Sequence, residues 1–434
     1  MKQLHRGWVV ILCLLLTFCL NKAALAAEAK IVESGDDGAI HWELDSDGKL
    51  TVSGTGTIEQ ILQVNYYSKK VKSIEIGDEI TGIGSWAFAN MLKTTKIILG
   101  DNVQTIAYDA FMNCPNVQSV EFKGDKFQKD ISFLGWMQSK KLKEVILPET
   151  AKYTIKSGML MSKTGDYVGV YLGKTPDKLY IPEGVEQLEA EAFAGRGMRE
   201  VQLPATLKSI GAFCFSWCKN LKSVVFTDIT SQITVADADP GVFNGCKMTQ
   251  LTLPPIFTDE RTMYSVVTNC AALKALSIGE GTKLIRGGFI RDCKALETLY
   301  IPSSITQIDD NAIEYSPKLT LMVREGSCAE TYAKQNGFKY AYFEPVTDII
   351  LSDSTLSLQK GKTAVLTAEI RPADATEKLL IWCTSDPTVA TVTKGKVKAV
   401  GEGKCDVICY AADGSCVRTV CHLEVVAKKT QHGN

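Results

Sequence analysis

Histidine is the side chain best suited to proton transfer at neutral pH, and it occurs three times beyond residue 26, as His41, His422 and His432. A catalytic site would need one of these histidines beside a nucleophile in a cleft. His41 and His422 each alternate with strand neighbours that we expect to face inward, so both imidazoles should point to solvent. His432 falls in a polar tail. We therefore predict no catalytic residue and a protein that is not an enzyme.

Two local patterns could hold a metal ion, and neither is complete. The acidic turn Asp45-Ser46-Asp47-Gly48 could begin a calcium loop, but Gly56 stands where such a loop needs a glutamate. Cys214 and Cys218 form a close pair, whereas a zinc site needs clustered Cys and His ligands. No glycine-rich phosphate-binding loop is present. We predict neither a metal nor a cofactor.

The elements that position these side chains belong to a unit that returns about every 23 residues. Ile83-Gly84-Ser85-Trp86-Ala87-Phe88 is echoed by Ile106-Ala107-Tyr108-Asp109-Ala110-Phe111. Such a period is typical of a solenoid, in which each coil buries its apolar edge against its neighbours. Each Ala-Phe pair is expected in a short helical turn. The predicted strands are centred on Ile74, Ile97, Val120, Val145, Leu179, Val201, Val224, Leu251, Leu276, Leu299 and Leu321.

Two residue types follow the same period and should fill the interior. Phenylalanines are expected to stack as a spine, formed by Phe88, Phe111, Phe193, Phe215 and Phe243. Five cysteines keep the repeat position and should form a buried ladder of free thiols, namely Cys114, Cys218, Cys246, Cys270 and Cys293. Parallel side chains about 4.8 Å apart on neighbouring coils do not meet the geometry of a disulfide.

Composition along the chain predicts five segments. Residues 1–26 carry Lys2 and Arg6, a short apolar run and Ala24-Leu25-Ala26, which describe a signal peptide. The others are an N-terminal β-hairpin cap at 27–70, the solenoid at 71–343, a β-sandwich at 345–427 and a polar tail at 428–434. We expect a secreted or cell-surface protein without a transmembrane segment in its mature chain. The 48 basic and 49 acidic residues nearly cancel, which argues against nucleic acid as a partner.

The period breaks twice before the sandwich. Residues 153–172 contain two alternating strands around Lys163-Thr164-Gly165-Asp166, which predicts a hairpin inserted into the solenoid. Residues 228–240 form a second, looser insertion. From Pro345 onward, short strands follow one another closely around the single tryptophan Trp382, as in an immunoglobulin-like sandwich.

The repeat resembles the BspA-like class of bacterial leucine-rich repeats. One unit carries its apolar positions in Ile210, Phe215, Cys218, Leu221, Val224 and Phe226. The opening hairpin, the inserted hairpin and the segment from Gly326 to Ala333 resemble that family's recurrent accessories. The last domain resembles the bacterial Ig-like group 2 module, through residues such as Gly361, Trp382, Gly395 and Asp413-Gly414. The resemblance implies a mainly β chain with short helical turns, a leucine-rich-repeat solenoid followed by an Ig-like β-sandwich, in an exported bacterial surface protein often concerned with adhesion.

The resemblance to the Ig-like module also bears on its cysteines. Alternation places Cys405 and Cys409 on one face of their strand and Cys421 inward on the next. We predict a Cys409–Cys421 disulfide across the final hairpin, a pair common in this module, with Cys405 as the alternative partner of Cys421. Cys383 follows an inward Trp382, and we expect Cys383 and Cys416 to be free and exposed.

Binding is predicted on the face of the repeated strands. The residue between the two inward residues of each strand points outward, and several of these outward residues are apolar or aromatic: Ile98, Ile146, Tyr180, Val225 and Tyr300. Such residues are costly to leave wet unless a partner covers them. We expect an adhesin that recognises an extracellular protein or polysaccharide, including one of host origin. The alternatives are that inserted segments cover this face, that the chain is a structural spacer, or that it is an accessory subunit of an extracellular hydrolase.

Overall fold

The computed structural model describes residues 29–59, 68–127, 131–235, 241–257 and 265–428. The predicted signal peptide, most of the polar tail and His432 lie outside these residues. No helix in the described part of the chain is long and apolar enough to cross a membrane.

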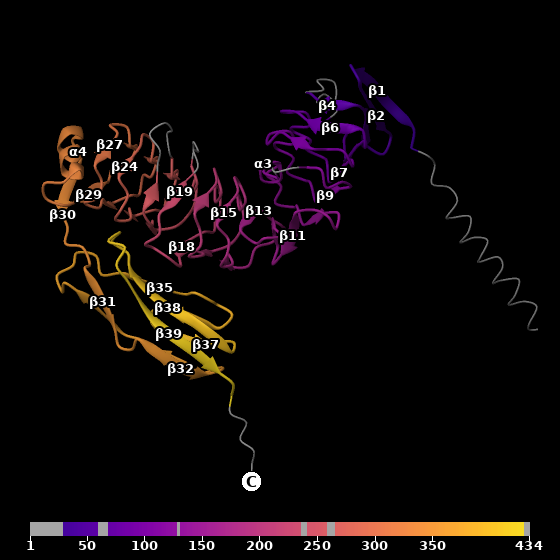
Figure 1. The fold of residues 1–434 in the computed structure, drawn as a ribbon. Coiled ribbons are helices and arrows are strands. Elements are labelled where there is room, and N and C mark those ends of the chain that lie inside the picture. The colour runs from indigo at the N-terminus through magenta and orange to yellow at the C-terminus, as the bar shows by residue number, and fades with distance from the viewer. Residues whose placement is uncertain (1–28, 60–67, 128–130, 236–240, 258–264, 429–434) are drawn as a thin grey trace, which may run out of the picture.

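A row of mostly parallel strands runs along one side of the solenoid and forms what we call the sheet face (Figure 1). All eleven strands predicted from the repeat are present in it. The row begins with a seven-stranded sheet of β1 (Ile31–Asp37), β2 (Ile40–Asp45), β3 (Lys49–Gly54), β5 (Ser73–Ile76), β7 (Lys96–Leu99), β9 (Ser119–Phe122) and β10 (Glu144–Ile146). It continues in a three-stranded sheet of β14 (Lys178–Tyr180), β16 (Glu200–Leu203) and β18 (Ser223–Phe226). A five-stranded sheet of β20 (Gln250–Thr252), β23 (Ala275–Ser277), β26 (Thr298–Tyr300), β29 (Thr320–Val323) and β30 (Lys339–Tyr342) completes the row.

Further rows of shorter strands close the coils, and apart from the inserted hairpin the sequence did not predict them. Many of these strands have two residues, too few for an alternation to be visible in the sequence. One row contains β4 (Gly56–Ile58), β6 (Ile80–Ile83) and β8 (Thr105–Ile106). The next contains β11 (Tyr153–Lys156), β12 (Met159–Ser162), β13 (Tyr167–Tyr171), β15 (Gln187–Leu188), β17 (Ser209–Ile210), β19 (Ile233–Val235) and β21 (Ile256–Phe257). The remaining rows are β22 (Val267–Thr268), β25 (Ile290–Arg291) and β28 (Ile313–Glu314), and the pair β24 (Leu284–Ile285) and β27 (Gln307–Ile308).

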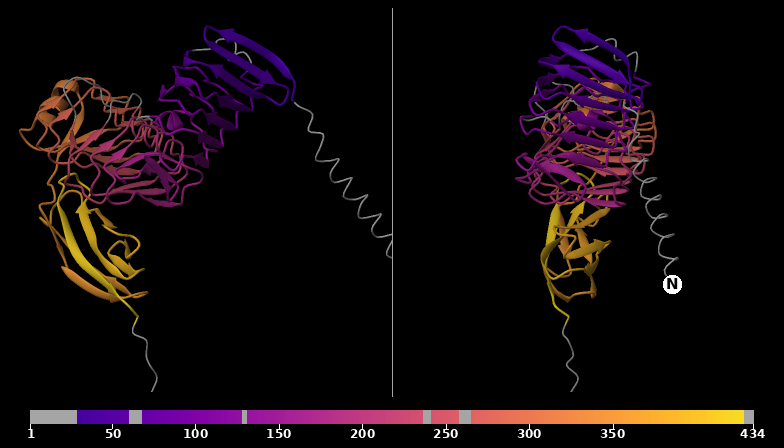
Figure 2. Two further views of the ribbon diagram at one scale, coloured as in Figure 1. Left: turned by 45° about the vertical axis from the view of Figure 1, so that its right-hand side comes forward. Right: turned by 90° about the vertical axis from the view of Figure 1, so that its right-hand side faces the viewer.

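Both predicted hairpins are present, and the inserted one is formed by β12 and β13. The opening hairpin is β2 and β3, with Trp42 and Val52 buried opposite each other. In the inserted hairpin, β13 pairs with β15, so the insertion is built into the row of short strands. The solenoid bends at this insertion (Figure 2). The second insertion supplies β19, which pairs with β17 and β21.

Helix is confined to two short elements in the part of the chain that the structure describes, α3 (Phe133–Trp136) and α4 (Cys328–Asn336). The Ala-Phe segments are hydrogen-bonded turns and not helices. Helix α4 closes the solenoid, and its N-terminus is capped by Ser327, whose side chain accepts a hydrogen bond from the Glu330 backbone N–H.

The phenylalanine spine and the cysteine ladder are both confirmed. Ring centroids are 5.3 Å apart for Phe88–Phe111 and for Phe193–Phe215, and 5.6 Å apart for Phe215–Phe243. All five ladder cysteines are buried free thiols. Each thiol also donates a hydrogen bond to a carbonyl of an earlier coil, as Cys114 does to Phe88 (3.3 Å). Neighbouring coils are therefore joined by backbone, aromatic and thiol contacts at once.

The C-terminal domain is a sandwich of short sheets. One sheet has four strands, β32 (Thr355–Gln359), β39 (Arg418–Val426), β38 (Gly403–Ala411) and β35 (Leu380–Thr384). The others are β33 (Thr363–Val365) with β37 (Lys396–Ala399) and β36 (Ala390–Thr393), and β31 (Asp348–Leu351) with β34 (Ala368–Arg371). Trp382 packs against the sandwich core, as predicted.

The sandwich lies against the sheet face of the C-terminal half of the solenoid (Figures 1 and 2). Tyr410 is fully buried, and its hydroxyl accepts a hydrogen bond from the Phe226 backbone N–H at 3.3 Å. The Gln202 side chain donates to the Thr384 carbonyl at 2.7 Å. Cys383 faces the solenoid and is buried, and Cys416 is half-buried, so the prediction that these two thiols are exposed is wrong.

Candidate functional site

The predicted outward residues of the sheet face form aligned columns. Parallel pairing puts Glu75, Ile98, Glu121 and Ile146 in register on β5, β7, β9 and β10. The same pairing aligns Tyr180 with Gln202 and Val225, and Ser277 with Tyr300. The strands were therefore predicted with the correct side facing outward.

The sandwich divides this face into an open part and a covered part. Ile146 is 42 % exposed and Ile98 and Tyr180 are half-buried, whereas Val225 and Tyr300 are each only 7 % exposed. The Tyr300 ring packs edge-on against Phe343, which leads into the sandwich, with centroids 5.3 Å apart. Val225 and Tyr300 therefore lie in a domain interface and cannot meet a partner in this arrangement.

Tyr180 stands at the boundary between the two parts, in a groove with a volume of about 630 Å³. Met159 and Pro176 line one side of the groove, and Asp386 and Pro387 of the sandwich line the other. Burial raises the pKa of Tyr180, so its phenol remains protonated at neutral pH. The groove offers a mostly apolar wall with an aromatic residue at the end of the open sheet face.

The open part also carries paired charges between its apolar residues. The Glu75 carboxylate forms ion pairs with Lys49 at 2.6 Å and Lys123 at 3.3 Å, and Glu121 forms one with Lys96 at 3.1 Å. These hydrogen bonds hold the pKa of Glu75 below its usual value, with the bond from Lys49 as the largest cause. The resulting surface alternates fixed charges with Ile98 and Ile146.

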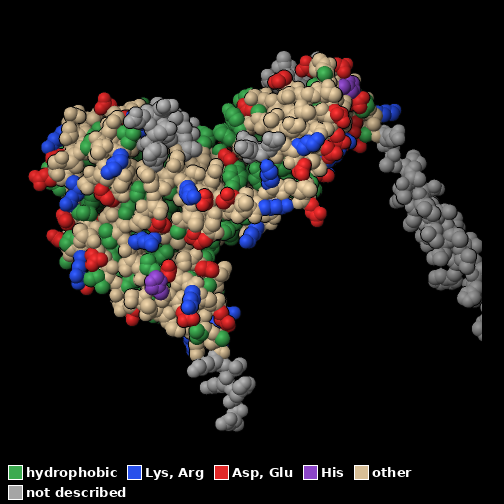
Figure 3. Space-filling model, viewed as in Figure 1, with side chains coloured by type: hydrophobic (Ala, Val, Ile, Leu, Met, Phe, Trp, Pro, Cys, Tyr) green, Lys and Arg blue, Asp and Glu red, His purple; other side chains and the backbone are tan. Residues whose placement is uncertain are grey.

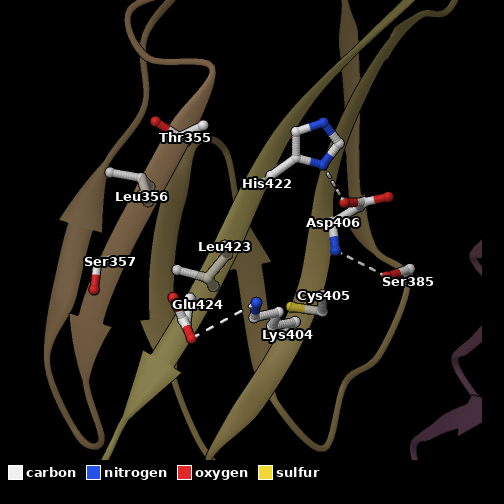
Figure 4. A pocket seen from close by; sticks show the side chains of 10 residues that line it. All are labelled: Thr355, Leu356, Ser357, Ser385, Lys404, Cys405, Asp406, His422, Leu423 and Glu424. Atoms are coloured by element: carbon white, nitrogen blue, oxygen red, sulfur yellow. Dashed lines mark hydrogen bonds and ion pairs between the residues drawn. The ribbon is translucent and has the colours of Figure 1, made fainter.

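A shallow pocket of about 680 Å³ on the sandwich contains His422, one of the histidines considered for catalysis (Figure 4). His422 Nδ1 lies 2.7 Å from Asp406 Oδ1, and its side chain is exposed, as predicted. Ser385 Oγ in this pocket accepts a hydrogen bond from the Asp406 backbone N–H. Burial raises the pKa of the Cys405 thiol to about 11, so the nucleophilic thiolate is rare at neutral pH. The pocket thus contains an exposed His–Asp hydrogen bond beside a thiol that is not activated.

His41 and the acidic turn at Asp45 both form hydrogen bonds within the opening hairpin. His41 Nδ1 lies 2.7 Å from Asp36, and a hydrogen bond to this carboxylate is the main reason why the pKa of His41 is raised. Asp45 accepts hydrogen bonds from the backbone N–H groups of Asp47 and Lys49, as expected for a turn. Among the described residues, no three His, Cys, Asp or Glu side chains lie where they could hold a metal ion.

The predicted disulfide is not formed. Cys409 and Cys421 are both buried free thiols, and so is Cys405. The register pairs Cys409 with Thr419 and Val407 with Cys421, so the two cysteines are diagonal neighbours. Diagonal neighbours are about 7–8 Å apart, beyond the usual range for a disulfide. Alternation identified the right face of each strand, but it did not give the register between the strands.

A third cavity lies away from every residue that the sequence analysis proposed for binding. It has a volume of about 390 Å³ and lies at the turns of the coils, where Trp136, Glu191, Phe213 and Trp217 line it. Trp217 could have revealed it, because this tryptophan directly precedes a ladder cysteine. The residues that precede the other ladder cysteines are small or polar, namely Asn113, Gly245, Asn269 and Asp292.

A parallel solenoid with a buried repeat spine, followed by a β-sandwich, defines a leucine-rich-repeat protein with an Ig-like domain. The family model for the BspA type leucine-rich repeat region matches residues 59–165 and 186–320 in six copies, and that for the group 2 bacterial Ig-like domain matches 345–420. The chain belongs to the BspA type leucine-rich repeat family and carries a group 2 bacterial Ig-like domain.

Individual relatives match only in part. An uncharacterized protein of Clostridium acetobutylicum is 31 % identical over 121 residues, covering 26 % of this chain and 12 % of that protein. Lacto-N-biosidase of Bifidobacterium bifidum is 45 % identical over 65 residues, covering 15 % of this chain and 6 % of the enzyme. These matches thus span less than a fifth of each relative's length.

Solved structures show more distant likeness. A leucine rich cell surface protein from Faecalibacterium prausnitzii has 19 % identity and a TM-score of 0.35, covering 71 % of this chain and 98 % of that one. The pneumococcal vaccine antigen PcpA has 13 % identity and a TM-score of 0.44, covering 73 % of this chain and all of that one (100 %).

Proposed function

We propose that the chain is an exported, non-enzymatic adhesin of a bacterial surface that captures an extracellular protein or polysaccharide. The capturing surface is the open part of the sheet face, from β5 to β10, together with the groove at Tyr180. Membership of a leucine-rich-repeat family and the predicted signal peptide support this role.

The observation that carries the proposal is the division of the sheet face. The sandwich covers the outward residues of β18 and β26 but leaves Ile98, Ile146 and Tyr180 accessible. Apolar side chains in line with fixed ion pairs suit a protein or polymer partner, because the apolar residues supply affinity and the charges supply orientation. The open surface is too extended for a small metabolite.

The position of the sandwich bears on the alternative role as a spacer. A spacer gains reach when its domains stand end to end, whereas this sandwich lies against the side of the solenoid (Figure 2). The likeness to Lacto-N-biosidase covers 6 % of that enzyme, so it gives little support to an accessory role in an extracellular hydrolase.

The test is binding of the purified chain to immobilised collagen, laminin, mucin and hyaluronan, measured by biolayer interferometry. Changing Tyr180 and Ile146 to serine should weaken capture at least about tenfold, as expected when central anchors of an interface are truncated. Val365→Ser is the matched control, because Val365 is an exposed apolar residue on the sandwich. Equal binding by the double variant and the control would exclude this surface.

A further inference from the structure

The turn before each ladder cysteine adopts a left-handed backbone that favours Asn, Asp and Gly. The φ angles at these positions are +57° at Asn113, +68° at Gly245, +53° at Asn269 and +55° at Asp292. Trp217 occupies the same position with a φ of +58°. A bulky side chain in this region costs free energy, and such residues persist mainly where the site has a use for them.

Trp217 is also unusually exposed and yet held in place. Its side chain is 52 % exposed. Its ring lies against Gly245, where a Cβ atom would come within 2.7 Å of the ring atom Cε3. The Trp217 backbone N–H donates to the Asn244 carbonyl at 2.7 Å. The chain therefore presents a positioned indole to solvent.

The indole forms one wall of the 390 Å³ cavity at the bend of the solenoid. Trp136 of α3 and Phe213 form further walls, with ring centroids 5.4 Å apart and planes at 77°. Tyr108 extends this aromatic row, with its centroid 5.2 Å from that of Trp136. Hydrophobic side chains gather on the surface at this bend (Figure 3).

A glycine brings the two halves of the cavity together. A Cβ atom on Gly135 of α3 would lie 2.8 Å from the Ala190 carbonyl oxygen, so the helix can approach the Glu191 turn only because residue 135 lacks a side chain. This contact places Trp136 beside residues that lie more than fifty positions away in the sequence.

Glu191 supplies the polar group of the cavity. It is only 6 % exposed, and its Oε2 atom has no hydrogen-bond partner. Gln138, which also lines the cavity, donates a hydrogen bond to the Glu191 side chain. A buried carboxyl oxygen without a partner is costly, and a ligand hydroxyl could satisfy it.

The lining selects among ligand classes. Among the residues that the structure describes, the lining carries one acidic and one basic side chain, Glu191 and Lys140, so it presents no cluster of like charges that would select an anion or a cation. The remaining fit is a neutral ligand with an apolar ring face for Trp217 and hydroxyl donors for Glu191. Sugars combine both features, because the C–H groups on one face of the ring are apolar and the hydroxyl groups surround the ring.

We propose that this cavity binds a sugar unit of a neutral oligosaccharide, which stacks on Trp217 and donates a hydroxyl hydrogen bond to Glu191. The site lies on the turns of the coils and not on the sheet face, so it is a separate binding function from the one proposed above.

The experiment screens the whole chain against an array of neutral oligosaccharides built from glucose, galactose, mannose, xylose and N-acetylglucosamine. The strongest binder is then titrated by tryptophan fluorescence and calorimetry. Trp217→Ala should weaken binding at least about tenfold, and Trp217→Phe, which keeps a ring, should weaken it less. Melting curves of both variants establish that they are folded.

Tyr315→Ala is the matched control. Tyr315 is an aromatic residue with a φ of +50° and is 71 % exposed, but it does not line this cavity. The Tyr315→Ala variant should bind the oligosaccharide as the unchanged chain does. The proposal is wrong if no neutral oligosaccharide is retained, if Tyr315→Ala loses as much affinity as Trp217→Ala, or if choline or an acidic polysaccharide binds in the cavity instead.

Discussion

The thiol groups show how much one residue's neighbours determine its chemistry. Burial raises the pKa of Cys114 and Cys218 to about 12, so both are unreactive thiols whose S–H groups bond carbonyls of another coil. Cys383 is equally buried, but the residues that bury it belong to the solenoid. Its thiol donates to the Phe226 carbonyl, which is more than 150 positions away in the sequence. The ladder thiols could be placed from their period, whereas nothing periodic marks Cys383.

At the same scale, Glu191 should make the stability of the chain depend on pH. Burial raises the pKa of Glu191 from about 4.5 to about 7, and a hydrogen bond from Gln138 opposes this rise. Of the described residues, the one basic residue that lines the same cavity is Lys140. Between these values the unfolded chain releases the proton that the folded chain keeps. The contribution to stability is therefore full below pH 4.5 and is lost as the pH rises through 7, by at most about 3 kcal/mol.

Thermal melting from pH 4 to pH 8 measures this effect. The unchanged chain should lose more stability over this range than Glu191→Gln, which cannot titrate. Parallel curves for the two proteins would show that the carboxyl group ionises normally in the fold.

At the scale of the element, each coil depends on the stacking of its phenylalanine. Phe111 is fully buried between Phe88 and Phe133, with centroids 5.3 Å and 5.8 Å away. Phe111→Ala should lower the free energy of unfolding by about 3–5 kcal/mol, because it leaves a cavity between two coils. The midpoint of urea unfolding, followed by circular dichroism, tests this.

Trp86→Ala is the comparison for the spine. Trp86 lies two residues before Phe88 and is exposed, so its loss should change the midpoint little. Similar midpoints for Phe111→Ala and Trp86→Ala would mean that the spine does not carry the stability of the coils.

At the scale of the whole molecule, the sandwich and the solenoid share a core. Ile408 and Tyr410 of β38 belong to the same buried cluster as the solenoid residues, while Val407 and Cys409 face the interior of the sandwich. Hydrogen bonds from Gln202 to Thr384 and from Thr252 to Ala412 complete the contact. We expect the two domains to move as one body.

Gln202→Arg should separate the two domains. Gln202 is buried and donates to both Thr384 and Thr227, and an arginine there would leave a charge without a partner in the interface. The radius of gyration from X-ray scattering should rise, and proteolysis between β30 and β31 should become faster. Glu121→Arg, on the open part of the sheet face, should leave both unchanged. An unaltered scattering curve for Gln202→Arg would argue against a shared core.

The sequence by itself determined the coils. The eleven strands, the spine and the ladder follow from contacts between neighbouring coils, and such contacts repeat along the chain at a fixed distance, so they appear as a period. Alternation likewise determined which side of each strand faces outward. The opening hairpin and the Ig-like strands were predictable for the same reason, since their turns and alternation are local.

Tertiary structure alone decided which outward residues remain accessible. Val225, Tyr300 and Ile146 occupy equivalent outward positions, yet only Ile146 stays open, because the sandwich folds back on the later coils. The Gln202–Thr384 contact joins residues 182 positions apart, and the Trp136–Phe213 contact crosses the inserted hairpin. Contacts between distant segments depend on shapes that exist only after each domain has folded, so no local pattern of residue types records them.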